Sequence, residues 1–383
     1  MIKKFIVRSS MFVARIILCS VLIVVLLRTT NYKPPTIYAQ SLESGTTIEA
    51  TVTEILEKKE IQLADRLQHY QKLELRVDSE RDKGKLLVIE NGNIPVVNQI
   101  LYKKGDKVTV LAQKDPDGND FYFITDFVRR DSLVLLTIVF VLITILIGKT
   151  SGIKSLLGMI FSFFMIFQFI LPRILAGHDP LWTVTFASVF IIPPTFYLSH
   201  GFNRKTSISI VATFVSLLVA SLMANYFIDT ARLTGYASEE AGFLQAAKGG
   251  AVNIKGLLLA GIMIGALGIL NDITISQASV VEQLKQTAGK IGFWDLYNRA
   301  MKVGQDHIAS MVNTLVLVYA GASLPLLLLF INNPHPFSEV VNYEIIAEEI
   351  VKTLLSSSAL VLAVPLTTLL ACWSYLRQSK QSD

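Results

Sequence analysis

The segment "AGIMIGALGILNDITISQAS", Ala260–Ser279, holds the clearest evidence for how this chain folds. Every residue from Ala260 to Leu270 is apolar or glycine, and no proline interrupts the segment before Ser279. At about 100° per residue, the small and polar residues gather on one helical face, which holds Gly261, Gly265, Gly268, Asp272, Ser276, Ser279 and Gln283. The segment therefore predicts a membrane-spanning helix whose glycine-lined face ends in a carboxylate.

The rest of the chain is also built around apolar runs. Of its 383 residues, 52% are hydrophobic and 17% are charged, and the apolar runs of about 17–23 residues match the thickness of a bilayer core. We therefore predict a membrane α-helical bundle of about eight transmembrane helices, at residues 11–27, 132–148, 153–171, 181–198, 207–228, 254–275, 308–331 and 353–376. The first belongs to an N-terminal membrane anchor, residues 1–30, and the other seven form a transmembrane domain, residues 131–377. We expect the anchor to be retained, because the alternative, cleavage after Ala39, lies well past the apolar run.

Residues 44–128 have a different pattern, in which apolar and polar residues alternate. Stretches such as "TIEATVTEIL", "KLELRVD" and "KVTVLAQ" show the two-residue period of half-buried strands, and Asn91-Gly92 and Gly105-Asp106 are turn signals between strands. We predict a small all-β, barrel-like domain of about five strands after the first helix. The domain lacks an aromatic and basic face, so we expect no nucleic-acid binding and regard it as a candidate surface for a protein partner.

Basic residues predict the orientation of the chain, because short cytoplasmic loops of membrane proteins are enriched in Lys and Arg. With the N-terminus in the cytoplasm, every predicted inner segment holds basic residues, among them Lys149, Lys154, Arg204, Lys205 and Arg377. We therefore predict a multi-pass protein of the plasma membrane with both termini cytoplasmic and the β-domain extracytoplasmic.

A second segment, "GQDHIASMVNTLVLVYAGASLP" from Gly304 to Pro325, opens the seventh predicted span with polar residues. Helical spacing puts Asp306, Ser310 and Asn313 on one face and His307 on a neighbouring face, at the depth expected for Asp272. The candidate polar cluster for transport or packing consists of Asp272, Ser276, Asp306, His307, Ser310 and Asn313. Such a set could relay a proton or hold a cation, or it could clamp helices by hydrogen bonds, and both interpretations stay open.

The three glycines before Asp272 have a separate expected role. Gly261, Gly265 and Gly268 share one face with the spacing that lets a neighbouring helix backbone approach closely. We predict that they form a helix-packing seam.

Enzyme and metal-binding motifs are absent from the sequence. It holds no HExxH motif, no P-loop and no GxGxxG between a strand and a helix. The two cysteines, Cys19 and Cys372, lie in separate predicted spans and form no CxxC pair. We therefore expect no enzymatic activity, no cofactor and no metal site.

Long motifs give the chain a resemblance to a known family. The runs "GLLLAGIMIGALGILNDITISQAS" and "GQDHIASMVNTLVLVYAGASLPLLLLF", with the segment "LTGYASEEAGFL", resemble the YibE/F-like family of bacterial multi-pass membrane proteins. The resemblance extends over about Leu133–Trp373 and implies an integral protein of the bacterial plasma membrane. One departure is Asn271, which stands where an apolar residue is more usual in the family. The resemblance implies no established activity and no catalytic residues.

Two functions are consistent with these patterns. The first is a permease-like transporter of a small solute or ion, in which Asp272 is the coupling carboxylate, His307 its proton partner and Asn313 a ligand or orienting group. The second is a non-transporting membrane scaffold or envelope-stress component whose β-domain binds a partner. The sequence identifies neither the solute nor the oligomeric state.

Overall fold

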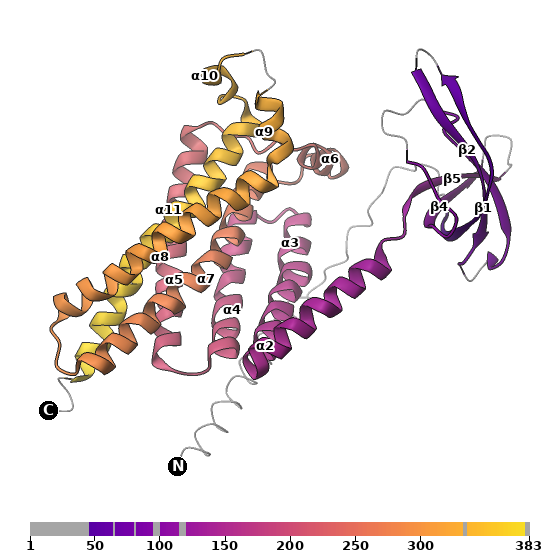
Figure 1. Cartoon of the computed structure of the whole chain (residues 1–383). Helices are drawn as coiled ribbons and strands as arrows, with labels where there is room; N and C mark the ends of the chain where they lie inside the picture. The colour runs from indigo at the N-terminus through magenta and orange to yellow at the C-terminus, as the bar shows by residue number, and fades with distance from the viewer. Residues whose placement is uncertain are drawn as a thin grey trace. The chain divides into compact units, whose positions relative to one another are not determined.

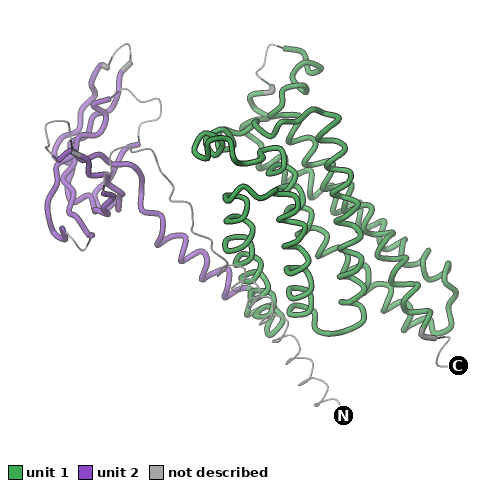
Figure 2. Tube along the Cα trace, turned by 180° about the vertical axis from the view of Figure 1, so that it is seen from behind, with its two compact units in different colours: residues 1–36, 144–383 green, residues 37–143 purple. Residues whose placement is uncertain are grey.

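A computed structural model of the chain describes residues 46–63, 66–79, 82–94, 100–114, 120–331 and 335–379. It divides into two compact units, one of residues 37–143 and one of residues 1–36 and 144–383 (Figure 2). The predicted anchor at residues 1–30 and the alternative cleavage after Ala39 lie outside the described residues.

The first unit holds a single antiparallel sheet of five strands (Figure 1). The strands are β1 (Thr46–Leu63), β2 (Arg66–Val77), β3 (Leu86–Asn91), β4 (Lys107–Lys114) and β5 (Asp120–Phe127), in the order β3-β2-β1-β4-β5. The two edge strands, β3 and β5, approach each other, so the sheet forms a half-barrel. The all-β domain expected from the alternating sequence is confirmed.

Alternation along each strand builds the core of this half-barrel. Leu73, Leu75 and Val77 on β2 point inward and are fully buried, as are Val108 and Val110 on β4. The turns depend on glycines with positive φ, a conformation that other residues adopt at a cost. Gly92 (φ 92°) and Gly105 (φ 94°) stand at two predicted turns.

The second unit consists of helices. They are α2 (Arg130–Met165, which begins in the first unit), the π-helical turn η2 (Ile166–Ile170), α3 (Leu171–Leu175), α4 (Pro180–His200), α5 (Arg204–Thr230), α6 (Glu239–Ala247), α7 (Ile254–Ala288), α8 (Phe293–Ala322), α9 (Leu324–Ile331), α10 (Phe337–Val340) and α11 (Glu344–Ser379). Among the described residues, five helical stretches are long and apolar enough to cross a membrane: Arg130–Leu175, Pro180–His200, Arg204–Thr230, Ile254–Ala288 and Glu344–Arg377.

The helices differ in two places from the predicted spans. The spans at 132–148 and 153–171 lie on one stretch, Arg130–Leu175, which is broken at Lys149 (φ 49°, ψ −130°). The span at 308–331 is divided between α8 and α9, and neither is among the five stretches. A bundle of eight transmembrane helices therefore stays a prediction, and five candidate spans are what the described residues show.

Polar side chains join the long helices inside the bundle. The Ser209 hydroxyl of α5 donates to the carbonyl of Thr274 on α7 (3.1 Å), and the Thr213 hydroxyl lies 2.9 Å from that of Thr274. The Gln277 amide of α7 donates to the carbonyl of Ala300 on α8 (3.1 Å) and to the hydroxyl of Thr368 on α11 (2.8 Å). These bonds hold α7 at the centre of the unit, against α5, α8 and α11.

Basic residues are in excess at one end of this helical unit. The chain segments at one end, where α4 meets α5, α7 meets α8, and α11 finishes, hold Arg204, Lys205, Lys285, Lys290, Arg299, Lys302 and Arg377. The opposite end, marked by α6 and α10 in Figure 1, holds the acidic residues Asp229, Glu239, Glu240, Glu339 and Glu344 together with the basic residues Arg232, Lys248, Lys255 and Lys352. The basic residues that the sequence assigned to inner segments thus gather at one end.

Candidate functional site

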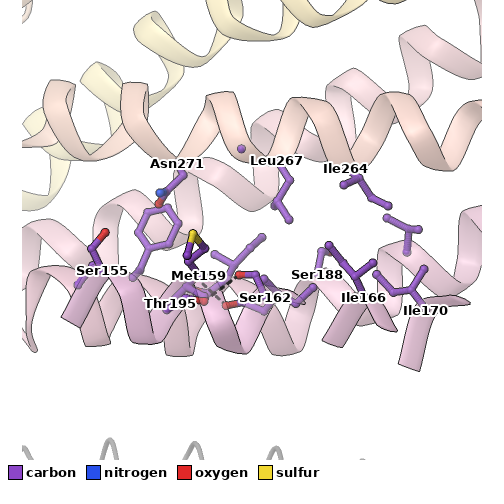
Figure 3. A pocket seen from close by; sticks show the side chains of 17 residues that line it. Ser155, Met159, Ser162, Ile166, Ile170, Ser188, Thr195, Ile264, Leu267 and Asn271 are labelled. Carbon is purple, nitrogen blue, oxygen red and sulfur yellow. Dashed lines mark hydrogen bonds between the residues drawn. The ribbon is translucent and has the colours of Figure 1, made fainter. Parts of the chain in front are cut away.

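A cavity of about 290 Å³ lies between the second half of α2 with η2, α4 and α7. Figure 3 shows its two ends: Asn271 and Ser155 lie at one, and Ile166 and Ile170 lie at the other. Thr195 lies nearer the first end. The end at Asn271 is therefore the more polar one, whereas the other end is mostly apolar and has Ser188 beside Ile166.

Local features of three helices form this cavity. The π-helical turn Ile166–Ile170 lines it from one side, and such turns are often found at functional sites. Gly158 of α2 and Gly268 of α7 also line it. A Cβ atom added at Gly268 would meet no atom within 4 Å, so the missing side chain leaves the space open.

Three of the five hydroxyl groups that line the cavity donate their protons to nearby carbonyl groups. Ser162 donates to the carbonyl of Gly158 (3.1 Å), Ser188 to that of Thr185 (2.7 Å) and Thr195 to that of Ile191 (2.7 Å). Each hydroxyl oxygen keeps acceptor capacity. The Oδ1 atom of Asn271 is buried and has no hydrogen-bond partner among the described residues. None of the residues that line the cavity is charged.

Asp272 follows Asn271 on α7 and is the acidic group closest in sequence to the cavity. The ionisable groups nearest to its carboxylate in electrostatic terms are the imidazoles of His200, the last residue of α4, and His307 on α8. No hydrogen bond joins His307 to Asp272 among the described residues, so their pairing stays a prediction. Three helices contribute ionisable groups to this position, which we call the Asp272 group: Asp272, His200 and His307.

The comparison with protein families bears on this helical unit. The model of the YibE/F-like protein family matches residues 136–377. The chain belongs to the YibE/F-like family. Neither a curated protein nor a solved structure was found to match it. The family and the five apolar helices together indicate a membrane protein, and the cavity and the Asp272 group both lie within the part of the chain that matches the family.

The remaining predicted cluster residues of this YibE/F-like protein lie elsewhere. Asp306, Ser310 and Asn313 are exposed on α8, on a different face from the buried Gly304 and Leu315. Ser276, one turn after Asp272, is half-buried on α7. None of the six predicted cluster residues, Asp272, Ser276, Asp306, His307, Ser310 and Asn313, lines the cavity.

The predicted glycine seam has no neighbouring backbone among the described residues. A Cβ atom at Gly261 or Gly268 would meet nothing within 4 Å, and one at Gly265 would lie 3.6 Å from the Tyr319 hydroxyl. The close helix approach occurs at Gly304 on α8 instead. There, a Cβ atom would lie 2.5 Å from Cγ1 of Val364 and 3.0 Å from the Gln277 amide nitrogen.

Three functional candidates were missed in the sequence. Asn271 was noticed as a departure from the family pattern, but its unpartnered carbonyl depends on the packing of α4 against α7. His200 lies two positions beyond the predicted end of its span, so its proximity to Asp272 required the fold. The third is an ion-pair cluster at the opposite end of the unit, where Lys352 lies 2.7 Å from the buried Glu348 and 3.1 Å from Glu349.

Proposed function

We propose that this membrane protein is a permease-like transporter of a small solute or ion, and that the solute occupies the cavity between α2, α4 and α7. The observation that supports the proposal best is the position of the cavity beside the Asp272 group. Asn271, at the polar end of the cavity, and Asp272 are consecutive residues on the same turn of α7. Binding at one would therefore change the surroundings of the other.

The chemistry of the Asp272 group suits coupling to protons. An ionisable side chain within a membrane helix is costly, and such residues commonly belong to ion or proton pathways. Carboxylate and imidazole side chains are the groups that commonly carry protons along such pathways, so His200 and His307 are the candidates for passing a proton to or from Asp272. In this proposal Asp272 is the coupling carboxylate, and the two histidines are its proton partners. Ser276, Asp306, Ser310 and Asn313 remain candidates for the polar entrance at the same end.

The orientation of the chain is part of the same proposal. The end with the basic residues faces the cytoplasm, because cytoplasmic segments are enriched in Lys and Arg. Both termini are then cytoplasmic and the half-barrel is extracytoplasmic, at a bacterial plasma membrane. The Asp272 group faces the cytoplasmic side of the bilayer.

Transport can be tested with the purified full-length chain in proteoliposomes. Charge movement on a supported membrane is recorded while a panel of small solutes and inorganic ions is applied, with and without a pH gradient. We expect a solute that evokes a current with the wild type, and loss of that current in Asp272→Asn. Asp295→Asn is the matched control, because Asp295 is exposed at the start of α8 and bonds to Arg299 (2.9 Å). Equal currents in wild type and Asp272→Asn for every solute would contradict the proposal.

A second function, a scaffold whose β-domain binds a partner, is favoured by one observation. Leu86 and Val88 on β3 and Phe121 on β5 are more than half exposed, although strands usually keep such side chains inside. The two functions differ in what a deletion does. If removing residues 45–128 abolishes the cellular phenotype of the protein while Asp272→Asn retains it, the scaffold function is the correct one.

A further inference from the structure

We infer that the cavity between α2, α4 and α7 selects a small uncharged solute that donates a hydrogen bond at one end and is apolar at the other, such as an alcohol or a primary amide. This inference rests on the proposed function in one respect, because it takes the bound solute to be the one transported. The binding itself can be tested without transport.

The lining of the cavity favours an uncharged solute. All of its side chains are neutral, from Ser155 at one end to Ile170 at the other. An ion placed there would lose its hydration without gaining an opposite charge, which is strongly unfavourable. Asp272 does not compensate, because it does not line the cavity.

The hydrogen-bonding state of the lining favours a solute that donates at Asn271. Of the five hydroxyl groups in the lining, those of Ser162, Ser188 and Thr195 already donate their protons to backbone carbonyl groups, whereas those of Ser155 and Ser199 make no hydrogen bond among the described residues and can still donate to a bound solute. Asn271 adds a buried carbonyl oxygen with no donor in the part of the chain that is described. A buried acceptor without a partner is costly, so a hydroxyl or amide proton delivered to Asn271 would satisfy the clearest unmet need of the cavity.

The arrangement of the lining sets the direction in which such a solute lies. Asn271 and Ser155 lie at one end in Figure 3, and the isoleucines of η2, Ile166 and Ile170, lie at the other. A donor group directed at Asn271 would therefore place an apolar body along Met159 and against η2. A lipid acyl chain lacks the donor, and water lacks the apolar body, so these two alternatives satisfy only part of the site.

Photolabelling of the full-length protein in detergent tests this inference. The probe is a straight-chain octanol with a diazirine in its apolar part, compared with the methyl ether of the same molecule, which accepts but cannot donate. Adducts are located and quantified by mass spectrometry. We expect the alcohol to label the peptides around Met159, Ile166 and Ile264, with at least about fivefold less labelling by the ether, since a missing donor leaves the buried acceptor unpaired.

Two glycine variants separate the cavity from the rest of the helix surface. Gly268→Leu places a side chain in the open space of the cavity, and we expect it to abolish labelling there. Gly261→Leu is the matched control, because Gly261 lies on the same face of α7, also has open space around it and does not line the cavity. It should retain labelling. Asn271→Leu should reduce the preference for the alcohol over the ether to near one.

Several outcomes would overturn the inference. Equal labelling by alcohol and ether would indicate a lipid acyl chain, and labelling that survives Gly268→Leu would place the probe outside the cavity. Stronger labelling by the corresponding alkylammonium would indicate a cationic solute. The outcome for the proposed function can be read separately. Specific labelling without any solute current would support the binding site and reject transport. A solute current without alcohol labelling would support transport and reject this binding site.

Discussion

At the scale of single residues, glycines on neighbouring helices occupy opposite environments. The space for a Cβ atom at Gly304 is filled by Val364 of α11 and Gln277 of α7, whereas the space at Gly261 is open. Helix α8 is therefore fixed to α7 and α11 at Gly304, where the backbone comes close to both. The glycine face of α7 is open among the described residues and is free for another role, such as lining the cavity at Gly268.

This difference gives a direct prediction for stability. Gly304→Leu should lower the melting temperature of the purified protein in detergent, because overpacking a close contact costs about 1–3 kcal/mol or more. Gly261→Leu, the matched control on an open surface, should melt as the wild type does. If both variants melt alike, the close approach of α8 does not stabilise the fold.

The candidate site was only partly predictable from the sequence, and individual residues show why. Asp272 and His307 were identified because an acid and an imidazole in apolar helices are unusual, and that signal is local. Asn271 and His200 were not identified, because their importance depends on the fold. The carbonyl oxygen of Asn271 is buried without a donor, and His200 acts on the Asp272 carboxylate of another helix. Asp306, Ser310 and Asn313 gave the same local signal as His307 and are exposed, as Asp272 is, but no interaction of theirs with Asp272 is present among the described residues.

At the scale of elements, the break in α2 depends on one close contact. The chain leaves the helical conformation at Lys149, and a Cβ atom on the buried Gly152 would overlap the carbonyl oxygen of Thr144. A backbone oxygen cannot move aside as a side chain can. The break therefore requires glycine at position 152, whereas Gly148, with open space around it, does not have this constraint.

We predict different effects for alanine at these two positions. Gly152→Ala should reduce the folded yield and the melting temperature of the membrane protein, since the break must open to admit the methyl group. Gly148→Ala should leave both unchanged and serves as the control, because alanine favours a helix more than glycine does. The interpretation would be refuted by a Gly152→Ala protein with wild-type yield and stability.

Elements were predicted well where their signals are local. The five strands were recognisable because alternation and glycine turns operate over a few residues. Helix α8 begins at Phe293, well before the predicted span at 308, because its first turns are amphipathic instead of apolar. The π-helical turn at Ile166–Ile170 has no local sequence signal, since it depends on how η2 packs beside α4.

The half-barrel should show an alkaline limit to its stability that comes from Tyr102. Burial raises the pKa of this tyrosine, whose side chain is 5% exposed. In the unfolded chain the Tyr102 hydroxyl ionises near pH 10. Its contribution to the free energy of unfolding is therefore constant below about pH 10 and is lost as the pH rises further. The measurement is urea unfolding of a fragment of residues 44–128 at a series of pH values. Tyr102→Phe should reduce the loss of stability between about pH 9.5 and 11.5. An unchanged slope would show that other groups cause it. The Gln71 side-chain amide accepts a hydrogen bond from the backbone N–H of Tyr102 (2.9 Å) and donates one to its carbonyl (3.0 Å). Neither bond involves the Tyr102 hydroxyl, so the phenylalanine variant should fold.

At the scale of the whole molecule, the number of membrane crossings depends on the stretch Arg130–Leu175. Its 46 residues would extend about 69 Å as one straight helix, more than twice the roughly 30 Å of a bilayer core. The break at Lys149 divides it into two parts that are each long enough to cross. If this stretch crosses twice and α8 with α9 crosses once, the chain after the half-barrel crosses the membrane seven times. If this stretch crosses only once and α8 with α9 does not cross, it does so five times.

Both counts are odd, so a reporter at the C-terminus cannot distinguish them, and an internal position is needed. We predict that alkaline phosphatase, active only outside the cytoplasm, is active when fused after Val128 and after Gly177, and inactive when fused after Phe202 and after Asp383. The fusion after Gly177 is decisive, because a single crossing by Arg130–Leu175 would place that loop in the cytoplasm and leave the enzyme inactive. A fluorescent protein at the same positions should give the opposite pattern, since it matures in the cytoplasm. Activity after Phe202 and Asp383, together with inactivity after Val128 and Gly177, would reverse the orientation inferred from the basic residues, and the Asp272 group would then face the exterior.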